Sequence, residues 1–263
     1  MNKNDRALWE RLSKIDGARS HIDDILGTYK SDEFVRLISE WVGSISGCKV
    51  LKTDLREESD GEDEVLYTLS RQDAEFFGID ISSETAQRAD MLQQKMGLSH
   101  NYVAADVRAV PFSDDTFDVI ISTSTLDHFK KDSDLMLSLI ELKRVLKPGG
   151  KMVLTLNNKY NVNFYVMVKL ERMLGLINYP VRFYTFTRLK KMLDKAGLIV
   201  NNKDFIIHVV SPANTLLLLT RKIFDARCVN VVSGIFLRLA RWFGRRNTTK
   251  RYTGWFIAVL CSK

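Results

Sequence analysis

The sequence predicts an α/β fold: a doubly wound, seven-stranded and mostly parallel sheet. Between residues 49 and 156, short apolar segments of strand length alternate with segments of helical pattern. Strands that alternate with helices favour right-handed crossovers and a parallel sheet. Two later apolar segments, 205–210 and 255–262, supply the last two strands. The first five strands are expected at VLKTDL, AEFFGIDI, NYVAADV, FDVIIS and KMVLTL.

Helices are expected at 83–97 and 132–146, and the second ends just before the turn Pro148-Gly149-Gly150. Residues 157–186 are too many for a plain connection after the fifth strand. The chain is therefore expected to be one domain, 1–263, with three additions to the sheet and its helices. These additions are a helical cap at about 1–46, a lid insert at about 157–186 and a basic amphipathic insert at about 213–251.

The composition is that of a folded protein of the reducing cytosol. The chain has 263 residues, of which 45% are hydrophobic, enough for a sizeable core. Cys48, Cys228 and Cys261 are too few and too scattered for a disulfide framework or a zinc site, so no metal is expected. The charged start lacks the apolar region of a signal peptide. A cytoplasmic location is expected, with association at a membrane surface as an alternative.

The net charge of +7 conceals two halves of opposite sign. Residues 1–150 contain 19 Lys/Arg and 28 Asp/Glu, whereas residues 151–263 contain 20 Lys/Arg and 4 Asp/Glu. The basic C-terminal part indicates either an anionic partner or docking on the acidic part of the same chain.

Asp80 is the first candidate for a binding residue. It ends the second expected strand, where a doubly wound fold places the acid that binds ribose hydroxyls. The alternative is a surface acid that caps the helix at 83–97, with Ser82 or Ser83 as the rival cap.

Three segments, GIDIS, VAADVRAVPFSDDTFDVIIST and LKRVLKPGGKMVLT, closely resemble class I S-adenosylmethionine-dependent methyltransferases that act on small molecules and lipids. The resemblance implies a Rossmann-like fold and S-adenosyl-L-methionine as cofactor. It implies that Asp80 with Ile81 binds the ribose, and that Asp106 with Val107 approaches the adenine. It also implies that Ser122 and Thr123 line the cleft near the methyl group, together with Asp127 and His128.

The segment that should hold the family's glycine-rich loop departs from this pattern. Lys52 occupies the place of the usual acid, Asp54 falls near the first glycine, and Leu55 follows it. Those glycines allow positive φ and close approach of backbone to ligand. Seven acids within 54–64 would repel a pyrophosphate, which argues against a nicotinamide-dependent reductase. They are compatible with the amino and sulfonium charges of S-adenosylmethionine. Most of this run is expected to be a solvated loop, with Asp54 as the exception.

For the chemical step, His128 is the best candidate for a general base, because histidine titrates near neutrality. Asp127 is the second. The segment STSTLDHF lacks the Asn/Asp-Pro-Pro-aromatic signature of amino-group methyltransferases, which favours an oxygen or carbon acceptor. The predicted function is methyl transfer to a small or lipid-like acceptor. The alternative is a catalytically degenerate methyltransferase fold that serves as a binding or scaffold protein.

Residues 231–246 form a basic amphipathic pattern. Apolar side chains that include Trp242 share one face, while Arg238, Arg241 and Arg245 share another. Such a helix is typical of a membrane-surface segment, although it could equally pack its apolar face on the domain. The chain contains no recognised nucleic-acid module, so no nucleic-acid partner is expected.

Overall fold

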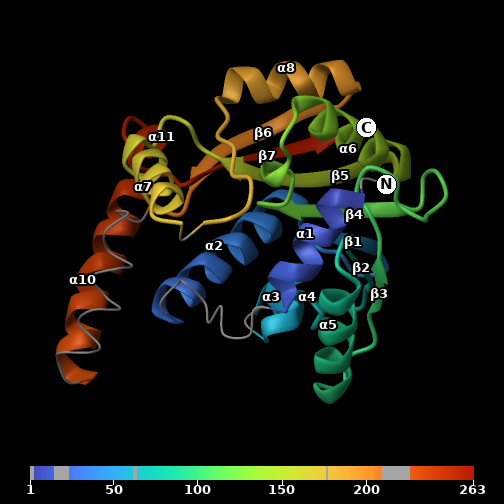
Figure 1. Ribbon diagram of the computed structural model, residues 1–263, viewed down its shortest axis with the longest axis horizontal. Helices are drawn as coiled ribbons and strands as arrows, with labels where there is room; N and C mark the ends of the chain where they lie inside the picture. Colours follow the sequence, from blue (N-terminus) through green and yellow to red (C-terminus); the bar gives the residue numbers. More distant parts are fainter. Residues whose placement is uncertain (1–2, 15–23, 62–63, 176, 209–225) are drawn as a thin grey trace.

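A computed structural model describes residues 3–14, 24–61, 64–175, 177–208 and 226–263. Its centre is a seven-stranded sheet in the order β3-β2-β1-β4-β5-β7-β6 (Figure 1). The first five strands are parallel, and β7 runs antiparallel to both of its neighbours. The predicted fold class is therefore confirmed. The parallel strands are β1 (Lys49–Thr53), β2 (Glu75–Asp80), β3 (Asn101–Ala104), β4 (Phe117–Thr123) and β5 (Leu146–Asn157).

Helices cover both faces of the sheet, as apolar parallel strands require. On one face, α6 (Asp132–Val145) and α8 (Phe186–Ala196) pack through leucines such as Leu139 and Leu193. On the other face lie α2 (Asp24–Val42) and α4 (Glu64–Leu69). Phe34, Leu37 and Ile38 recur at helical spacing and form the buried face of α2 in the core.

Three further helices lie around the start of the sheet. Helix α1 (Lys3–Ser13) contacts α5 (Ser83–Lys95), and α3 (Arg56–Asp60) also packs on α5. Ser82 caps α5 by accepting a hydrogen bond from the Thr85 N–H at 3.2 Å. Figure 1 shows α1 lying across the sheet on the side of α3 and α5.

The remaining elements belong to the two inserts. Helix α7 (Val162–Met173) lies in the lid insert, and α10 (Ala226–Gly244) with α11 (Lys250–Thr253) lies in the basic insert. Figure 1 shows α7 and α11 side by side, with α10 extending from them along the edge of the molecule. Residues 213–225 of the predicted insert, and 15–23 of the predicted cap, lie outside the described residues.

One predicted strand is placed wrongly. The sixth strand, β6, spans Ile199–Ile206, and β7 spans Phe256–Ser262. The expectation of a strand at 205–210 therefore captured only the end of β6, and 209–210 lie outside the described residues. The cause is that β6 is an edge strand with an irregular register between Val200 and Asn202. Its exposed polar residues hide the apolar alternation.

Candidate functional site

The strand order places the candidate residues together at the carboxyl ends of the parallel strands, which form one edge of the sheet. Strand β1 lies between β2 and β4, and the connections leave β1 and β4 in opposite directions. In open α/β sheets, ligands bind beyond the carboxyl ends of strands at such a switch point. Asp54 follows β1, Asp80 ends β2, and Ser122 and Thr123 end β4. The fold thus brings together most of the residues that the sequence singled out.

Asp54 and Asp80 form a pair of acids at this edge. Asp80 accepts hydrogen bonds from the backbone N–H of Leu55 at 3.1 Å and of Ser82 at 2.8 Å. Burial, and then the charge of Asp54, raises the pKa of Asp80 to about 7. Burial also raises the pKa of Asp54, although Lys52 and the Arg56 N–H partly offset it. Each oxygen of Asp80 receives one backbone donor, so each retains a lone pair for a ligand hydroxyl.

Asp54 has a backbone conformation that favours glycine. Its φ is +116°, in the region that side chains other than glycine rarely adopt. Ser124, just after β4, also has a positive φ of +52°. Residues held in such conformations cost about 1–3 kcal/mol each and cluster at functional sites. The loop after β1 therefore holds a strained residue directly after the strand, beside the candidate site.

The part of the acidic run that the structure describes is not a solvated loop, which corrects the expectation for Glu57, Glu58 and Asp60. These three acids lie in α3, and their charges are paired within the chain. Glu58 is buried and lies 2.5 Å from Lys52, which itself is 2% exposed. Lys52 also donates to the Asp54 carbonyl oxygen at 2.9 Å. The remaining pairs are Glu57 with Lys30 and Asp60 with Arg56 and Arg88.

This pairing explains why Lys52 can stand where the family has an acid. An unpaired ammonium in this position would be costly, since burial of a charge requires a partner. Glu58 supplies the partner, and the bond from Lys52 to the Asp54 carbonyl fixes the strained loop. The positive charge of Lys52, which stands where the family has an acid, is thus neutralised by Glu58 inside the loop.

Asp106 is held by the protein itself. Arg108 donates to both of its oxygens, through Nε at 2.9 Å to Oδ1 and through Nη2 at 2.7 Å to Oδ2. Burial opposes ionisation, but these bonds and the charge of Arg108 lower the pKa of Asp106. Arg108 also pairs with Asp5 of α1 and Asp134 of α6, at 3.2 and 3.1 Å. An adenine amine would have to compete with Arg108 for Asp106. Val107 beside it is buried.

A cluster of hydroxyls joins the ends of β1 and β4. Thr53 donates to Ser122 at 2.8 Å, and Thr125 donates to the Thr53 carbonyl oxygen at 2.6 Å. Ser122 is fully buried, whereas Thr123 is partly exposed. Ser122 therefore ties the two strands together and Thr123 is the more accessible of the two. The sequence did not indicate the partners Thr53 and Thr125, because hydroxyl residues at strand ends carry no distinctive pattern.

The two candidate catalytic residues differ sharply in environment. Asp127 is fully buried and accepts from the Asn157 backbone N–H at 2.9 Å, and burial raises its pKa. His128 is partly exposed, and its Nδ1 lies 2.9 Å from the Pro180 carbonyl oxygen. Its Nε2 lies 3.7 Å from Asp127 Oδ1. Asp127 therefore supports the backbone, and only His128 can meet a ligand.

Helix α1 covers this edge, which the sequence did not reveal. Trp9 packs against the rings of His128 and Tyr179, with centroids 5.4 and 5.7 Å away. Glu10 accepts from the Ser83 N–H at 2.8 Å and from its hydroxyl at 2.7 Å. Glu10 thus binds the start of α5, where a negative charge is favourable. The charge pattern of α1 gave no signal for this contact, because its partners are distant in sequence.

Comparisons with known proteins agree with this geometry. Residues 60–154 match the sequence family described as a methyltransferase domain. A sterol 4-C-methyltransferase of Caenorhabditis elegans is 33% identical over 91 residues, which are 34% of this chain and 26% of that protein. A ubiquinone biosynthesis O-methyltransferase of Parvibaculum lavamentivorans is 28% identical over 108 residues, which are 41% of this chain and 42% of that protein. The chain thus matches less than half the length of these relatives.

Among solved structures, a geranyl diphosphate C-methyltransferase from Streptomyces coelicolor has a similar fold. The TM-score is 0.57 at 10% identity, and the match covers 88% of this chain and 78% of that one. The strand order, the edge that gathers Asp54 and Asp80, and these matches define a Rossmann-like class I methyltransferase fold. Residues 60–154 are thus similar to a methyltransferase domain, and the C-methyltransferase of similar fold was solved with S-adenosyl-L-homocysteine, the demethylated form of the cofactor that the sequence implies.

The residues present fit that cofactor in part. Asp80 can accept the two ribose hydroxyls, and the Asp54 backbone follows the path that lets a loop approach a ligand. Asp54 and Asp80 lie beside this path, whereas Glu57, Glu58 and Asp60 are neutralised by cations of the chain. Asp106 fits less well while Arg108 holds both of its oxygens. Ile81 and Leu55 would serve as backbone and apolar neighbours of the ligand. The side chain of Leu55 is fully buried.

Proposed function

We propose that this protein transfers a methyl group from S-adenosylmethionine to an oxygen or carbon of a small or lipid-like acceptor. The observation that carries the proposal is the conformation of the loop after β1. Asp54 keeps a glycine-like φ of +116° directly beside Asp80, the acid at the end of β2. A loop with no ligand to approach would have no reason to retain such strain. The acceptor class is supported by the relatives, which include a sterol 4-C-methyltransferase and a ubiquinone biosynthesis O-methyltransferase.

The cofactor would supply an electrophilic methyl group, and the protein's own residues would position the acceptor and manage its proton. Methyl transfer depends mainly on alignment and exclusion of water. Trp9 and Tyr179 pack on the ring of His128 and shield it. His128 Nδ1 faces the Pro180 carbonyl oxygen, which favours the tautomer with a proton on Nδ1. Nε2 is then the acceptor, so His128 would take the proton of an acceptor hydroxyl through Nε2.

A second candidate function is that of a methyltransferase fold that binds a ligand without catalysis. It is favoured by one observation: Arg108 occupies both oxygens of Asp106 and links them to α1 through Asp5. In this case α1 would be a permanent cover over the cleft.

The two candidates are separated by transfer of a labelled methyl group. Protein, S-adenosylmethionine labelled in its methyl group and a mixed lipid extract are incubated, and label in the organic phase is counted. Methyl transfer predicts label that falls at least tenfold with His128→Gln. Binding of the cofactor with no label above that of the His128→Gln variant would support the second candidate.

We further propose that α10 places the protein at an anionic membrane surface from the cytoplasmic side. The helix divides its apolar residues between two faces. Ala240 is buried and Phe236 packs on the core, whereas Ile235, Leu239 and Trp242 are 45–52% exposed. An exposed apolar strip on a basic helix is typical of an interfacial helix. The cations near it are Arg238, Arg241, Arg245 and Arg246, all exposed, with Arg246 stacked over Trp242 at 4.0 Å.

No helix within the described ranges is long and apolar enough to span a bilayer. Contact with a membrane would therefore be peripheral for this part of the chain. Co-sedimentation with vesicles that contain anionic lipid should fall when Arg238, Arg241 and Arg245 are changed to Glu. The matched control changes Lys190, Lys191 and Lys195 of α8 to Glu and should leave sedimentation unchanged. Equal sedimentation of both variants with the wild type would contradict the proposal.

The organisation as one domain of residues 1–263, and the absence of a nucleic-acid partner, stay predictions of the sequence.

A further inference from the structure

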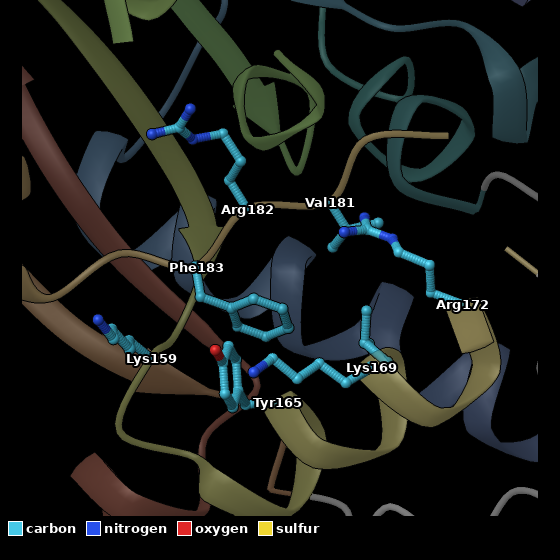
Figure 2. A pocket seen from close by; sticks show the side chains of 8 residues that line it. Lys159, Tyr165, Lys169, Arg172, Val181, Arg182 and Phe183 are labelled. Carbon is cyan, nitrogen blue, oxygen red and sulfur yellow. The ribbon is translucent and has the colours of Figure 1, made fainter. Parts of the chain in front are cut away.

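A cavity of about 250 Å³ lies between α7 and the segment 181–183. Tyr165, Val168 and Phe183 form its apolar part. Figure 2 shows Lys159, Lys169 and Arg172 spaced around it, with the Lys169 side chain extended toward Tyr165. The cavity therefore combines an aromatic floor with three cations.

In the part of the chain that the structure describes, these three cations have no carboxylate partner. Within the described ranges, no ion pair to an acid is formed by Lys159, Lys169 or Arg172. Lys169 lies 4.7 Å from the Tyr165 ring centroid, and Arg172 donates to the Tyr179 carbonyl oxygen at 3.3 Å. By contrast, Glu57, Glu58 and Asp60 of the loop after β1 are each paired with at least one cation. The lining of the cavity thus carries a local excess of positive charge.

The fourth cation of the lining is excluded from this set. The Arg182 guanidinium donates to the Lys130 carbonyl oxygen and to Asp132, at 2.6 Å each. Figure 2 shows this guanidinium directed away from Lys169 and Tyr165. Arg182 is a structural residue, and only its stem borders the cavity.

An apolar strip follows the same helix next to the cations. Val162, Val166, Leu170 and Met173 are 52–84% exposed and recur every three or four residues. That spacing puts them on one side of α7, adjacent to the side that carries Lys169 and Arg172. A contiguous patch of exposed apolar side chains often marks a binding surface, whereas apolar side chains exposed singly are common on any protein. The helix thus offers cations and apolar surface to the same ligand.

We propose that this cavity binds the phosphate group of an amphiphile, whose hydrocarbon chain lies along the strip of Val162, Val166, Leu170 and Met173. Lysine and arginine donors form strong charge-assisted hydrogen bonds to phosphate oxygens, and Arg172 can bind two oxygens at once. Tyr165 and Phe183 border these donors with apolar ring surface. A phosphate without a chain would leave the strip uncovered, and a chain without a phosphate would leave three cations unneutralised.

The cavity also adjoins the proposed active site. The Arg182 backbone N–H, on the same segment, donates to the Asp127 carbonyl oxygen at 2.9 Å. The Pro180 carbonyl oxygen, two residues earlier, lies against His128. An amphiphile held by its phosphate would therefore lie on segment 181–183, the segment whose neighbour Pro180 contacts His128. In treating the amphiphile as the acceptor, this inference rests on the proposed function.

The test is calorimetric titration of the full chain with octyl phosphate below its micellar concentration, without any methyl donor. Octyl glucoside and inorganic phosphate serve as probes that keep only the chain or only the anion. Octyl phosphate should bind at least tenfold more tightly than either. The joint substitution Lys159→Ala, Lys169→Ala and Arg172→Ala should weaken octyl phosphate at least tenfold. The control Lys190→Ala, Lys191→Ala and Lys195→Ala should change it less than twofold.

A separate variant tests the strip. Leu170→Ser should weaken octyl phosphate about threefold or more and leave inorganic phosphate unchanged. Binding that the triple substitution does not weaken, equal binding of octyl glucoside, or equal binding of inorganic phosphate would each overturn the inference. Thermal unfolding of each variant establishes that it is folded. Because no methyl donor is present, failure here is distinct from a failure to bind S-adenosylmethionine.

Discussion

Asp54 is the residue at which the loop after β1 can be tested most directly, because it combines a charge and a strained backbone. Asp54→Asn removes the charge and keeps the oxygen that accepts from the Arg56 N–H at 2.9 Å. Asp54→Gly and Asp54→Ala both remove the side chain, but only glycine accepts a φ of +116° without strain. The comparison of Asn with wild type isolates the charge. The comparison of Gly with Ala isolates the strain.

The size of the charge effect follows from Asp80, whose pKa of 3.8 rises to about 7 through burial and through Asp54. One pKa unit corresponds to about 1.4 kcal/mol, and burial is the larger cause, so the share of Asp54 is about 1–2 kcal/mol. Raised carboxyl pKa values mean that the folded state binds more protons than the unfolded state between about pH 4 and 7. The wild type therefore loses stability as pH rises through this window, and Asp54→Asn should lose less.

The assay is urea unfolding at pH 8 and near pH 4. Asp54→Asn should be about 1–2 kcal/mol more stable than wild type at pH 8, and the difference should shrink toward zero near pH 4. Asp54→Gly should exceed Asp54→Ala by about 1–3 kcal/mol at both pH values, since strain does not titrate. The reasoning is refuted if Asp54→Asn is less stable than wild type at pH 8, or if Gly and Ala are equal.

Two further predictions concern the loop and its cover. Glu58→Gln should destabilise the protein by about 3–5 kcal/mol in urea unfolding, because it leaves the buried Lys52 without its anion. The double change Lys52→Met with Glu58→Leu should recover most of that loss, and no recovery would mean that the pair is not isolated from its surroundings. Hydrogen bonds from Ser83 outweigh burial and lower the pKa of the Glu10 carboxyl, so its contact with α5 is lost only as pH falls below the ordinary titration range of a glutamate. Glu10→Gln should shift the Trp9 fluorescence to longer wavelength at neutral pH, as acid does for the wild type, and an unchanged spectrum would show that α1 is held by other contacts.

The sheet could be predicted from sequence because central parallel strands are buried on both faces and read as apolar runs. Residues 119–122 of β4 and residues 152–157 of β5 are examples in which every residue is buried. The edge strand β6 could not, since its polar exposed residues interrupt the pattern. The position of Asp80 followed from strand order, because an acid at the end of the second strand has one place in this fold.

The partners of the site residues could not be predicted. Arg108 is only two residues from Asp106, yet nothing in the sequence says that it turns back on that acid and reaches Asp5. The burial of Asp127 and the pairing of Lys52 with Glu58 arise from tertiary packing. Long-range contacts of this kind produce no periodic pattern along the chain. The sequence therefore indicated the acidic residues of the site but not the partners that hold them in place.

The measurement that tests the central claim most directly is calorimetric titration with S-adenosylmethionine and with its demethylated product. The wild type should bind both, and Asp80→Ala should weaken binding at least tenfold, because the ribose hydroxyls would lose their acceptor. The control Asp118→Ala removes an acid that pairs with Lys147 at the opposite ends of the strands, and it should leave binding unchanged. Absence of binding to the wild type at millimolar ligand would contradict the account.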